Sequence, residues 1–120
     1  MSAGRYDLSI EQGATFTLPI SYKDSNDAVI NLSSNYTARM RIKESHGGTL
    51  LASTESGDST GATITITLAA SGNNVTISMT ATNTAALNFD NAVYDVELVS
   101  GDVVDRLLEG RVKLKKEVTV

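Results

Sequence analysis

Two runs near the N-terminus alternate apolar residues with polar or small ones. Apolar residues occupy positions 6, 8 and 10 in the first run, and positions 16, 18, 20 and 22 in the second. Gly13 separates the two runs. A period of two places side chains alternately on the two faces of an extended chain, so both runs are predicted to be half-buried β-strands. The N-terminal part of the chain is therefore expected to form β-strands of an all-β fold.

The same alternation recurs along the chain, with turn-forming residues between the runs. Further strands are expected at 29–32, 36–43, 50–53, 63–68, 75–79, 91–99 and 103–114. The cluster Asp24–Asp27 predicts a hairpin turn before the short run 29–32, and Ser100–Asp102 predicts another before the last strand. Gly110 predicts a bulge in that strand, and the Gly/Ser-rich segment 55–61 predicts a flexible loop. The segment 80–87 is the only one expected to be helical, over about two turns.

These elements predict one domain over residues 1–120, an immunoglobulin-like antiparallel β-sandwich of about eight strands with one short helical turn. Such sandwiches often carry a tyrosine near the start of the next-to-last strand, whose hydroxyl bonds to the backbone a few residues upstream. Tyr94 is the candidate for this tyrosine corner. The chain has no Trp and no Cys, which excludes an antibody-type domain.

Charge and composition exclude several classes of function. The chain has 10 basic and 14 acidic residues, a net charge of −4, which argues against non-specific nucleic-acid binding. The absence of Cys excludes disulfides and thiolate metal sites. The first five residues lack the apolar region of a signal peptide, and no run approaches the ~20 apolar residues of a membrane span. We therefore expect neither a nucleic-acid nor a membrane partner.

No set of residues predicts catalysis. His46 is the only histidine, lies beside Gly47 in a predicted turn, and is interpreted as a solvated turn residue. Asp95 and Glu97 are two residues apart on one strand, so both carboxylates should face solvent on one side of the sheet rather than meet across a cleft. We expect no enzyme activity and assign no catalytic residue.

Asp24, Asn26 and Asp27 offer oxygen ligands of the kind that calcium prefers. Their spacing does not match the 12-residue EF-hand loop, and the same residues are ordinary turn formers. We therefore assign no metal-binding or cofactor-binding residue and expect no cofactor.

Basic residues follow two predicted strand faces: Arg39, Arg41 and Lys43 on one, and Arg111, Lys113 and Lys115 on the other. In an immunoglobulin-like order, Arg39 and Arg41 should lie near Asp95 and Glu97, with the second set beyond them. Such cross-strand ion pairs commonly cover a solvent-facing sheet. No aromatic residue alternates with these charges, so stacking of nucleic-acid bases has no platform.

Strand edges are the remaining candidates for contact with a partner. Pro19, the only proline, predicts that the second run is an edge strand or contains a bulge. Thr63, Thr65 and Thr67 form a polar, uncharged row that suits either solvent or a subunit interface. The lone proline and the alternating Val–Thr tail 118–120 together suggest that subunit contact uses a strand edge.

Most of the chain resembles a group of small β-sandwich virion structural proteins of tailed bacteriophages, including cyanophages. The segments that carry the resemblance are Tyr6–Asp24, Ile30–Glu44, Thr84–Leu98 and Arg106–Val112. They are also similar to the N-terminal sandwich modules of phage baseplate and receptor-binding proteins. The resemblance implies a structural protein that acts by protein–protein attachment, with no catalytic residue to carry over.

The resemblance further implies a place in the virion, after synthesis in the host cytoplasm, with other virion proteins as partners and several copies of the chain in each particle. A tail or baseplate position is the leading expectation, and a capsid decoration (cement) protein is the alternative. A host- or carbohydrate-binding module is the further alternative. It would need exposed aromatic residues, whereas most of the six aromatics fall in core phase: Tyr6, Phe16, Tyr22, Tyr36, Phe89 and Tyr94.

Overall fold

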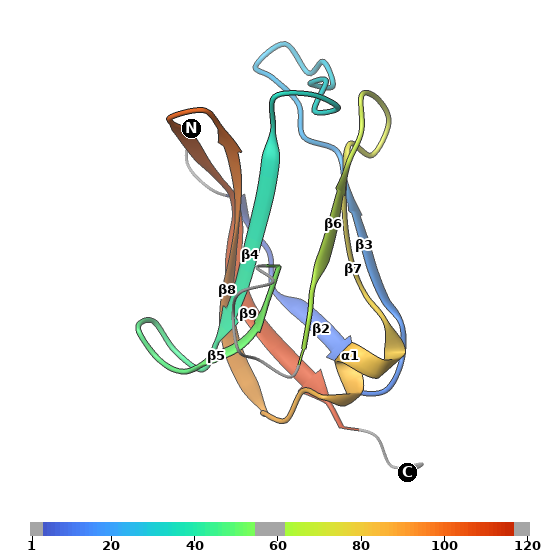
Figure 1. Ribbon diagram of the computed structural model, residues 1–120, viewed down its shortest axis with the longest axis vertical. Coiled ribbons are helices and arrows are strands. Elements are labelled where there is room, and N and C mark those ends of the chain that lie inside the picture. The colour runs from blue at the N-terminus through green and yellow to red at the C-terminus, as the bar shows by residue number, and fades with distance from the viewer. Residues whose placement is uncertain (1–3, 55–61, 117–120) are drawn as a thin grey trace.

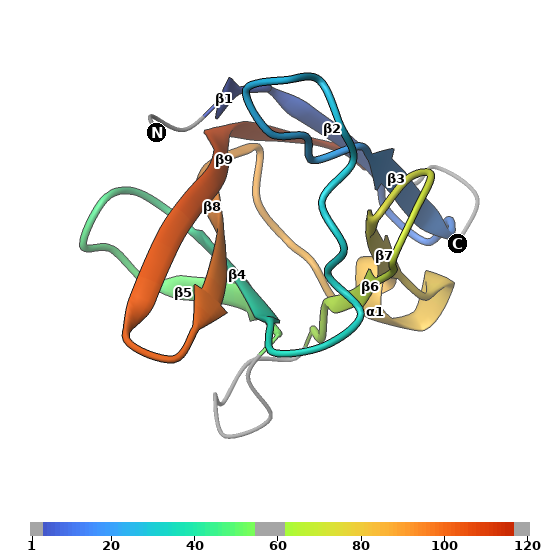
Figure 2. The ribbon, with the colours of Figure 1, turned by 90° about the horizontal axis from the view of Figure 1, so that it is seen from above.

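The computed structural model describes residues 4–54 and 62–116, which form two β-sheets packed face to face (Figure 1). The molecule is elongated, with principal extents of 46 × 28 × 25 Å. Seen from above, the two sheets face each other across the molecule, and the light-blue connection crosses the near end between them (Figure 2). The predicted all-β sandwich is confirmed.

The larger sheet has six strands and the smaller has three. The larger sheet runs in the order β1 (Gly4–Arg5), β9 (Val103–Lys115), β8 (Asn91–Ser100), β4 (Thr37–Lys43) and β5 (Leu50–Ser53), and β2 (Leu8–Glu11) also pairs with β9. The smaller sheet runs in the order β3 (Phe16–Ile20), β7 (Val75–Met79) and β6 (Thr65–Leu68). The helix α1 (Ala81–Ala85) connects β7 to β8.

This strand order is that of an immunoglobulin-like sandwich. The smaller sheet matches the B-E-D order of such domains, and β9-β8-β4-β5 matches the G-F-C-C′ order. Named strands pair antiparallel throughout, except at one edge of the larger sheet, where β1 and β2 run parallel to β9. The N-terminal segment therefore closes the larger sheet beside the last strand.

The core follows from alternation along each strand. On β8 the even-numbered residues from Ala92 to Leu98 are buried, while the odd-numbered residues face outward and are only partly covered. On β7 the apolar residues Val75, Ile77 and Met79 point inward from the facing sheet. Because both sheets present one apolar face, packing them together removes that surface from water and stabilises the sandwich.

The predicted helix and the edge position of Pro19 are confirmed, whereas the predicted bulge lies elsewhere. The helix forms with Thr80 as its N-cap, because the Thr80 hydroxyl accepts a hydrogen bond from Asn83 N. Pro19 does lie on an edge strand, β3. The predicted bulge lies at Leu107, not at Gly110: the register shifts so that Leu108 pairs with Val96 and Arg106 with Glu97. Segment 55–61 and tail residues 117–120 lie outside the described residues.

The run 29–32 is not a strand. Lys23 and Val29 form only an isolated bridge across the Asp24–Asp27 turn, after which the chain crosses the end of the sandwich. Leu32 is buried there at 1% exposure, and its N–H bonds to Ala69 O. Alternation predicted a strand, but the buried Leu32 closes the end of the core instead of joining a sheet.

The first predicted strand is interrupted in the middle. Tyr6 and Asp7 separate β1 from β2, although the register with β9 is the same on both sides: Arg5 lies opposite Glu109 and Leu8 opposite Val112. The interruption is therefore a local change of hydrogen-bond partners rather than a slip in register.

Candidate interaction surface

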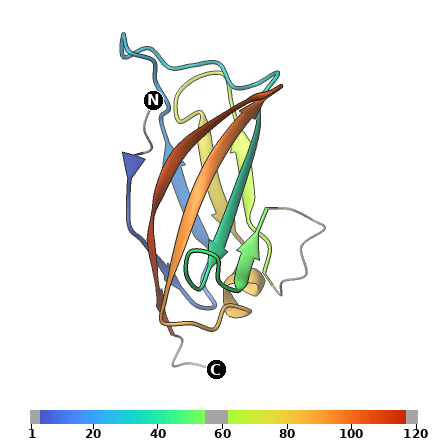
Figure 3. The ribbon, with the colours of Figure 1, turned by 90° about the vertical axis from the view of Figure 1, so that its left-hand side faces the viewer.

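The outer face of the larger sheet carries most of the basic residues of the chain. In Figure 3 this face is turned toward the viewer, with β9, β8 and β4 running along the molecule. The basic residues on the outward phase of β4 and β9 are Arg39, Arg41, Lys43, Arg106, Arg111, Lys113 and Lys115. Asp95 and Glu97 lie between them on β8, so the face is a charged surface with acidic residues along its centre.

Cross-strand register brings the predicted charges together. Arg39 lies opposite Glu97, and Arg41 lies opposite Asp95, as expected. The Arg39 Nε donates to Glu97 Oε1 at 2.7 Å, and the Arg106 guanidinium lies 3.6 Å from both Glu97 Oε2 and Asp95 Oδ2. Glu97 is thus ion-paired with both Arg39 and Arg106, and Asp95 is ion-paired with Arg106. The two carboxylates are therefore engaged in ion pairs and do not form a free pair of the kind that hydrolysis needs.

The second basic set lies farther along β9, with fewer acidic neighbours. Arg111 is opposite Val93 and Lys113 is opposite Asn91, so neither has an acidic residue directly across on β8. Lys115 is opposite Glu11 of β2. The predicted arrangement, with this set on the far side of the acidic residues, is confirmed by the register.

A shallow hollow of about 280 Å³ lies on this face, beneath the connection between β4 and β5. It is lined by polar and charged side chains that include Arg41, Asp95, Glu109 and His46. Ligand pockets are usually larger, enclosed and mostly apolar, so the hollow does not suit a buried small molecule. His46 is exposed at its rim and has no hydrogen-bonded or ion-paired partner among the described residues.

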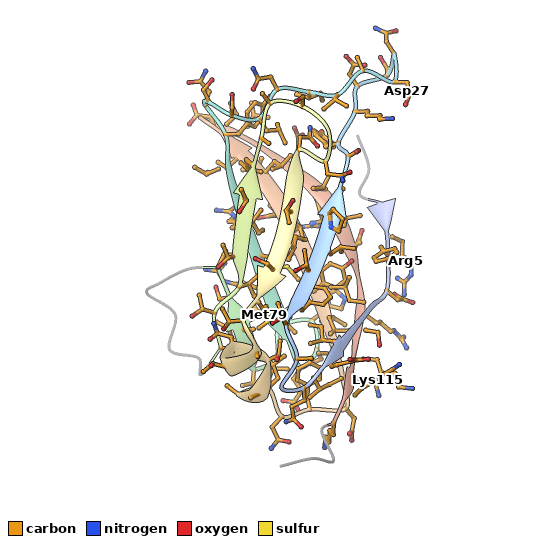
Figure 4. The ribbon with its side chains drawn as sticks, turned by 90° about the vertical axis from the view of Figure 1, so that its right-hand side faces the viewer. Arg5, Asp27, Met79 and Lys115 are labelled. Atoms are coloured by element: carbon orange, nitrogen blue, oxygen red, sulfur yellow. The ribbon has the colours of Figure 1, made fainter. Side chains whose placement is uncertain are left out.

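In the Asp24–Asp27 turn, the candidate calcium ligands make contacts within the turn and with its neighbouring residues. Asp24 Oδ1 accepts hydrogen bonds from Asn26 N at 2.9 Å and Ala28 N at 3.1 Å, and Asp27 pairs with Lys23 at 3.5 Å. Across residues 4–54 and 62–116, no three His, Cys, Asp or Glu side chains gather as metal ligands would. Figure 4 places Asp27 at the end of the sandwich opposite Lys115.

Tyr94 is the centre of a contact that the sequence indicated only in part. Its hydroxyl donates to the carbonyl of Tyr6, in the N-terminal segment, and not to a residue a few positions upstream as predicted. Burial, followed by the neighbouring Asp7 carboxylate, raises the pKa of the Tyr94 hydroxyl above its ordinary value. The predicted tyrosine corner is therefore wrong: the Tyr94 hydroxyl instead joins the N-terminal segment to β8.

Gly110 and Asp7 complete this contact, and sequence reasoning missed both roles. Gly110 pairs with Tyr94 across β8 and β9, and a Cβ at Gly110 would lie 2.4 Å from Tyr6 O. Only glycine allows the Tyr6 backbone to approach so closely. Asp7 Oδ1 accepts a hydrogen bond from Arg111 N at 3.0 Å.

Asn74 is a second internal polar centre that the sequence did not identify. Its side chain is fully buried, accepts from Tyr22 N at 2.7 Å, and donates to Tyr22 O and Ile30 O at 2.9 and 2.7 Å. The only local signal is an Asn directly before a strand, and that position also occurs in ordinary turns. Asn74 thereby holds the segment that crosses the end of the core.

Aromatic side chains contribute little to the described surface. Tyr22, Phe89 and Tyr94 are buried, whereas Phe16 and Tyr36 are partly covered. Tyr6 was expected in the core, but its side chain is 50% exposed because the chain leaves the regular strand there. The described surface thus offers one well-exposed aromatic ring, which is a small platform for a sugar.

Comparison with known proteins yields no relative: no family model matches the chain, and no curated protein sequence matches it. No helix among the described residues is long and apolar enough to span a membrane. The chain is thus characterised by its immunoglobulin-like topology, its charged sheet face and its strand edges.

Proposed function

We propose that this chain is a structural protein of a tailed-phage virion that acts by protein–protein attachment, in the tail or baseplate. The observation that carries the proposal is that the buried polar side chains of the described residues bind other groups of the fold. Every buried side-chain nitrogen or oxygen of the described residues has a hydrogen-bond partner, and Asp95 and Glu97 are ion-paired. A reaction centre usually keeps some such groups unpaired, whereas no buried side-chain nitrogen or oxygen of the described residues lacks a partner.

The strand edges and the charged sheet face support attachment as the mode of action. Sandwich edges accept additional strands, and the small polar hollow on the charged face does not suit a buried small molecule. The resemblance of segments such as Tyr6–Asp24 and Ile30–Glu44 to small phage sandwich proteins supports the virion as the place of action. It does not separate the baseplate from the capsid, so a decoration protein remains the second candidate position.

The test is to locate the chain in purified particles by cryo-microscopy, with antibody labelling of the same preparation. Density for the sandwich at the tail tip would support the baseplate position, and density over the head would support the decoration alternative. Absence of the chain from virions, shown by both methods and by mass spectrometry of the particles, would overturn the proposal.

A titration with host-surface glycans separates attachment from sugar binding. Tyr6 supplies the well-exposed aromatic ring, so a carbohydrate module would show a change in tyrosine fluorescence that Tyr6→Ala abolishes. We expect no saturable change for the native chain. Saturable binding that depends on Tyr6 would favour the host-binding alternative instead.

A further inference from the structure

The hairpin of β8 and β9 carries the most exposed apolar residues in the described part of the chain. Val103 is 59% and Val104 is 48% exposed, and Tyr6 is the only other large apolar residue exposed to this degree there. The hairpin tip leans away from the smaller sheet, at the upper left of Figure 1. Both valines lie just after the tight turn at Gly101 and Asp102.

On one side of this hairpin, the part of the chain that the structure describes leaves the strand edge open. The N-terminal strand β1 pairs with β9 only from Leu108 onward, through Gly4. Within residues 4–54 and 62–116, no strand pairs with Val103–Arg106 on that side of β9. The edge ends at the bulge beside Arg106, where the register with β8 shifts.

The turn geometry determines which main-chain groups face the open side. Ser100 and Val103 close a two-residue turn, with Gly101 at a positive φ of 59°. The closing pair of such a hairpin exchanges hydrogen bonds, and antiparallel pairs then alternate, so Val99–Val104 is a pair without hydrogen bonds. The N–H and C=O of Val104 therefore point outward, toward a strand that could join this edge.

Three other edges of the sandwich, at β3, β5 and β6, are less suited to strand addition. β3 contains Pro19, which lacks an N–H, and β5 is flanked by the bridge between Ser53 and Thr63. β6 is open, but its outward residues are threonines rather than apolar side chains. Among the described residues, the Val103–Arg106 edge alone combines outward main-chain groups with exposed valines, a combination that favours strand addition.

The residues at this edge are complementary to themselves across a twofold axis. If two copies pair antiparallel with Val104 opposite Val104 of the second copy, Asp102 lies opposite Arg106 of that copy, and the reverse pair also forms. Val104 and Arg106 both belong to the outward phase, since Arg106 is opposite Glu97 and contacts its carboxylate. Arg106 is half-exposed and has five N–H donors, so it can also reach an acidic residue of the second copy in addition to Asp95 and Glu97.

We propose that two copies of this chain associate through the β9 edge at Val103–Arg106, in antiparallel register centred on Val104. The larger sheets of the two copies then form one continuous sheet. The paired segment is short, so association in solution is weak, and it becomes stronger where other contacts already hold copies close together in a particle. The inference deepens the proposed structural role by naming one contact between copies.

A single introduced cysteine tests the register directly. The native chain has no Cys, so Val104→Cys creates a unique thiol. Residues opposite each other in a hydrogen-bonded antiparallel pair have Cα atoms about 5.5 Å apart, within the range that a disulfide spans. Under mild oxidation, Val104→Cys should form a cross-linked dimer at least about tenfold faster than Thr67→Cys, a matched control on the β6 edge.

Sedimentation velocity of the full chain over a range of concentrations provides the second test. Val104→Pro removes the outward N–H without removing a bond to β8, so it should weaken association about tenfold or more while the native circular dichroism spectrum remains. Val104→Lys keeps the N–H and places two like charges opposite each other, so it should also give monomers. Thr67→Lys on the β6 edge should associate like the native chain.

Equal cross-linking of Val104→Cys and Thr67→Cys would overturn the inference, as would native association of both Val104→Pro and Val104→Lys. A concentration-independent monomer in the native chain would also overturn it. These results concern the isolated chain and are independent of its place in a virion. A dimer without virion localisation would contradict the proposed function alone, and a virion position without a dimer would contradict this inference alone.

Discussion

The hydroxyl of Tyr94 donates a hydrogen bond to the main-chain carbonyl of Tyr6, 88 residues earlier in the chain. Tyr6 N bonds to Glu109 O at 3.0 Å, and in an uninterrupted parallel ladder Tyr6 O would accept from Arg111 N. Tyr94 takes that carbonyl, and the Asp7 carboxylate accepts the Arg111 N–H in its place. One tyrosine therefore interrupts the first strand and binds it to the centre of the larger sheet, without any loss of register.

Replacing Tyr94 with Phe should destabilise the fold by about 1–3 kcal/mol, because the carbonyl of Tyr6 loses its donor at a partly buried site. Urea unfolding followed by circular dichroism measures this change in the free energy of unfolding. Tyr6→Phe is the matched control, since it keeps the carbonyl and alters only an exposed ring, so it should change stability by less than about 0.5 kcal/mol. Equal effects of the two variants would contradict the assigned hydrogen bond.

Gly110→Ala should destabilise the chain by about 1–3 kcal/mol, because the new Cβ would lie 2.4 Å from Tyr6 O and the N-terminal segment must move. Hydrogen exchange should show loss of protection in β1 and β2 before any change in the smaller sheet. The control is Gly4→Ala on β1, whose Cβ would meet the flexible Leu108 side chain at 3.3 Å and Leu107 O at an ordinary contact distance of 3.6 Å. Native protection of β1 and β2 in Gly110→Ala would show that this close approach is not needed.

Stability should decrease at alkaline pH through the tyrosines. Burial is the main cause that raises the pKa of Tyr94, and it also raises that of Tyr22, where Asp105 adds to the effect. Above a pH of about 10 the unfolded tyrosines lose a proton that the folded ones keep, so rising pH favours the unfolded state. This contribution is fully present below about pH 10 and is lost as the pH rises toward the raised values.

The comparison that checks this prediction is urea unfolding of the native chain and Tyr94→Phe at about pH 8 and about pH 11. The native chain should lose more stability than the variant over this interval, since lysine deprotonation acts on both alike. An equal loss of unfolding free energy in both proteins would show that Tyr94 does not contribute to the alkaline loss of stability.

Asn74→Ala should cost about 3 kcal/mol or more, since it leaves Tyr22 N, Tyr22 O and Ile30 O without their side-chain partner in a buried place. Thermal unfolding by calorimetry measures the effect. Asn73→Ala is the adjacent control, because Asn73 is exposed and accepts only from the Ser21 hydroxyl, at 3.0 Å. Similar melting temperatures for the two variants would mean that the end of the core does not depend on Asn74.

Glu97→Gln should cost about 1 kcal/mol at low ionic strength and less in high salt, because it removes a charge held by Arg39 and Arg106 at a partly covered site. Asp90→Asn, which breaks the exposed contact with Lys116, should have no measurable effect at any salt concentration. Urea unfolding at two salt concentrations checks both expectations. A cost for Glu97→Gln that does not change with salt would indicate lost packing instead of lost charge.

Local patterns predicted the elements whose stability depends on one apolar face. Strands such as Val75–Met79 and Thr37–Lys43 follow directly from alternation, and the β8–β9 turn follows from Gly101. The pairing of Arg39 with Glu97 was also predicted, because strand order and a period of two place both side chains outward. Each of these features depends on residues near in sequence or on one common topology.

Other features depended on contacts between distant segments. The run 29–32 alternates like a strand, but Asn74, 44 residues from Ile30, holds it across the end of the core. Gly110 was interpreted as a bulge because a glycine in a strand often marks one. Its actual role is to admit the Tyr6 backbone, and the local sequence carries no sign of that approach.

By itself, the sequence determined an all-β sandwich, its turns, its charge pattern and the inward position of Tyr94, because periodicity and turn chemistry act over a few residues. Only the tertiary structure decided that the Tyr94 hydroxyl binds Tyr6, that the bulge lies at Leu107, and that Val103 and Val104 remain on an open edge. Those outcomes depend on which distant backbone groups meet, and a hydrogen bond between residues 88 positions apart leaves no local pattern.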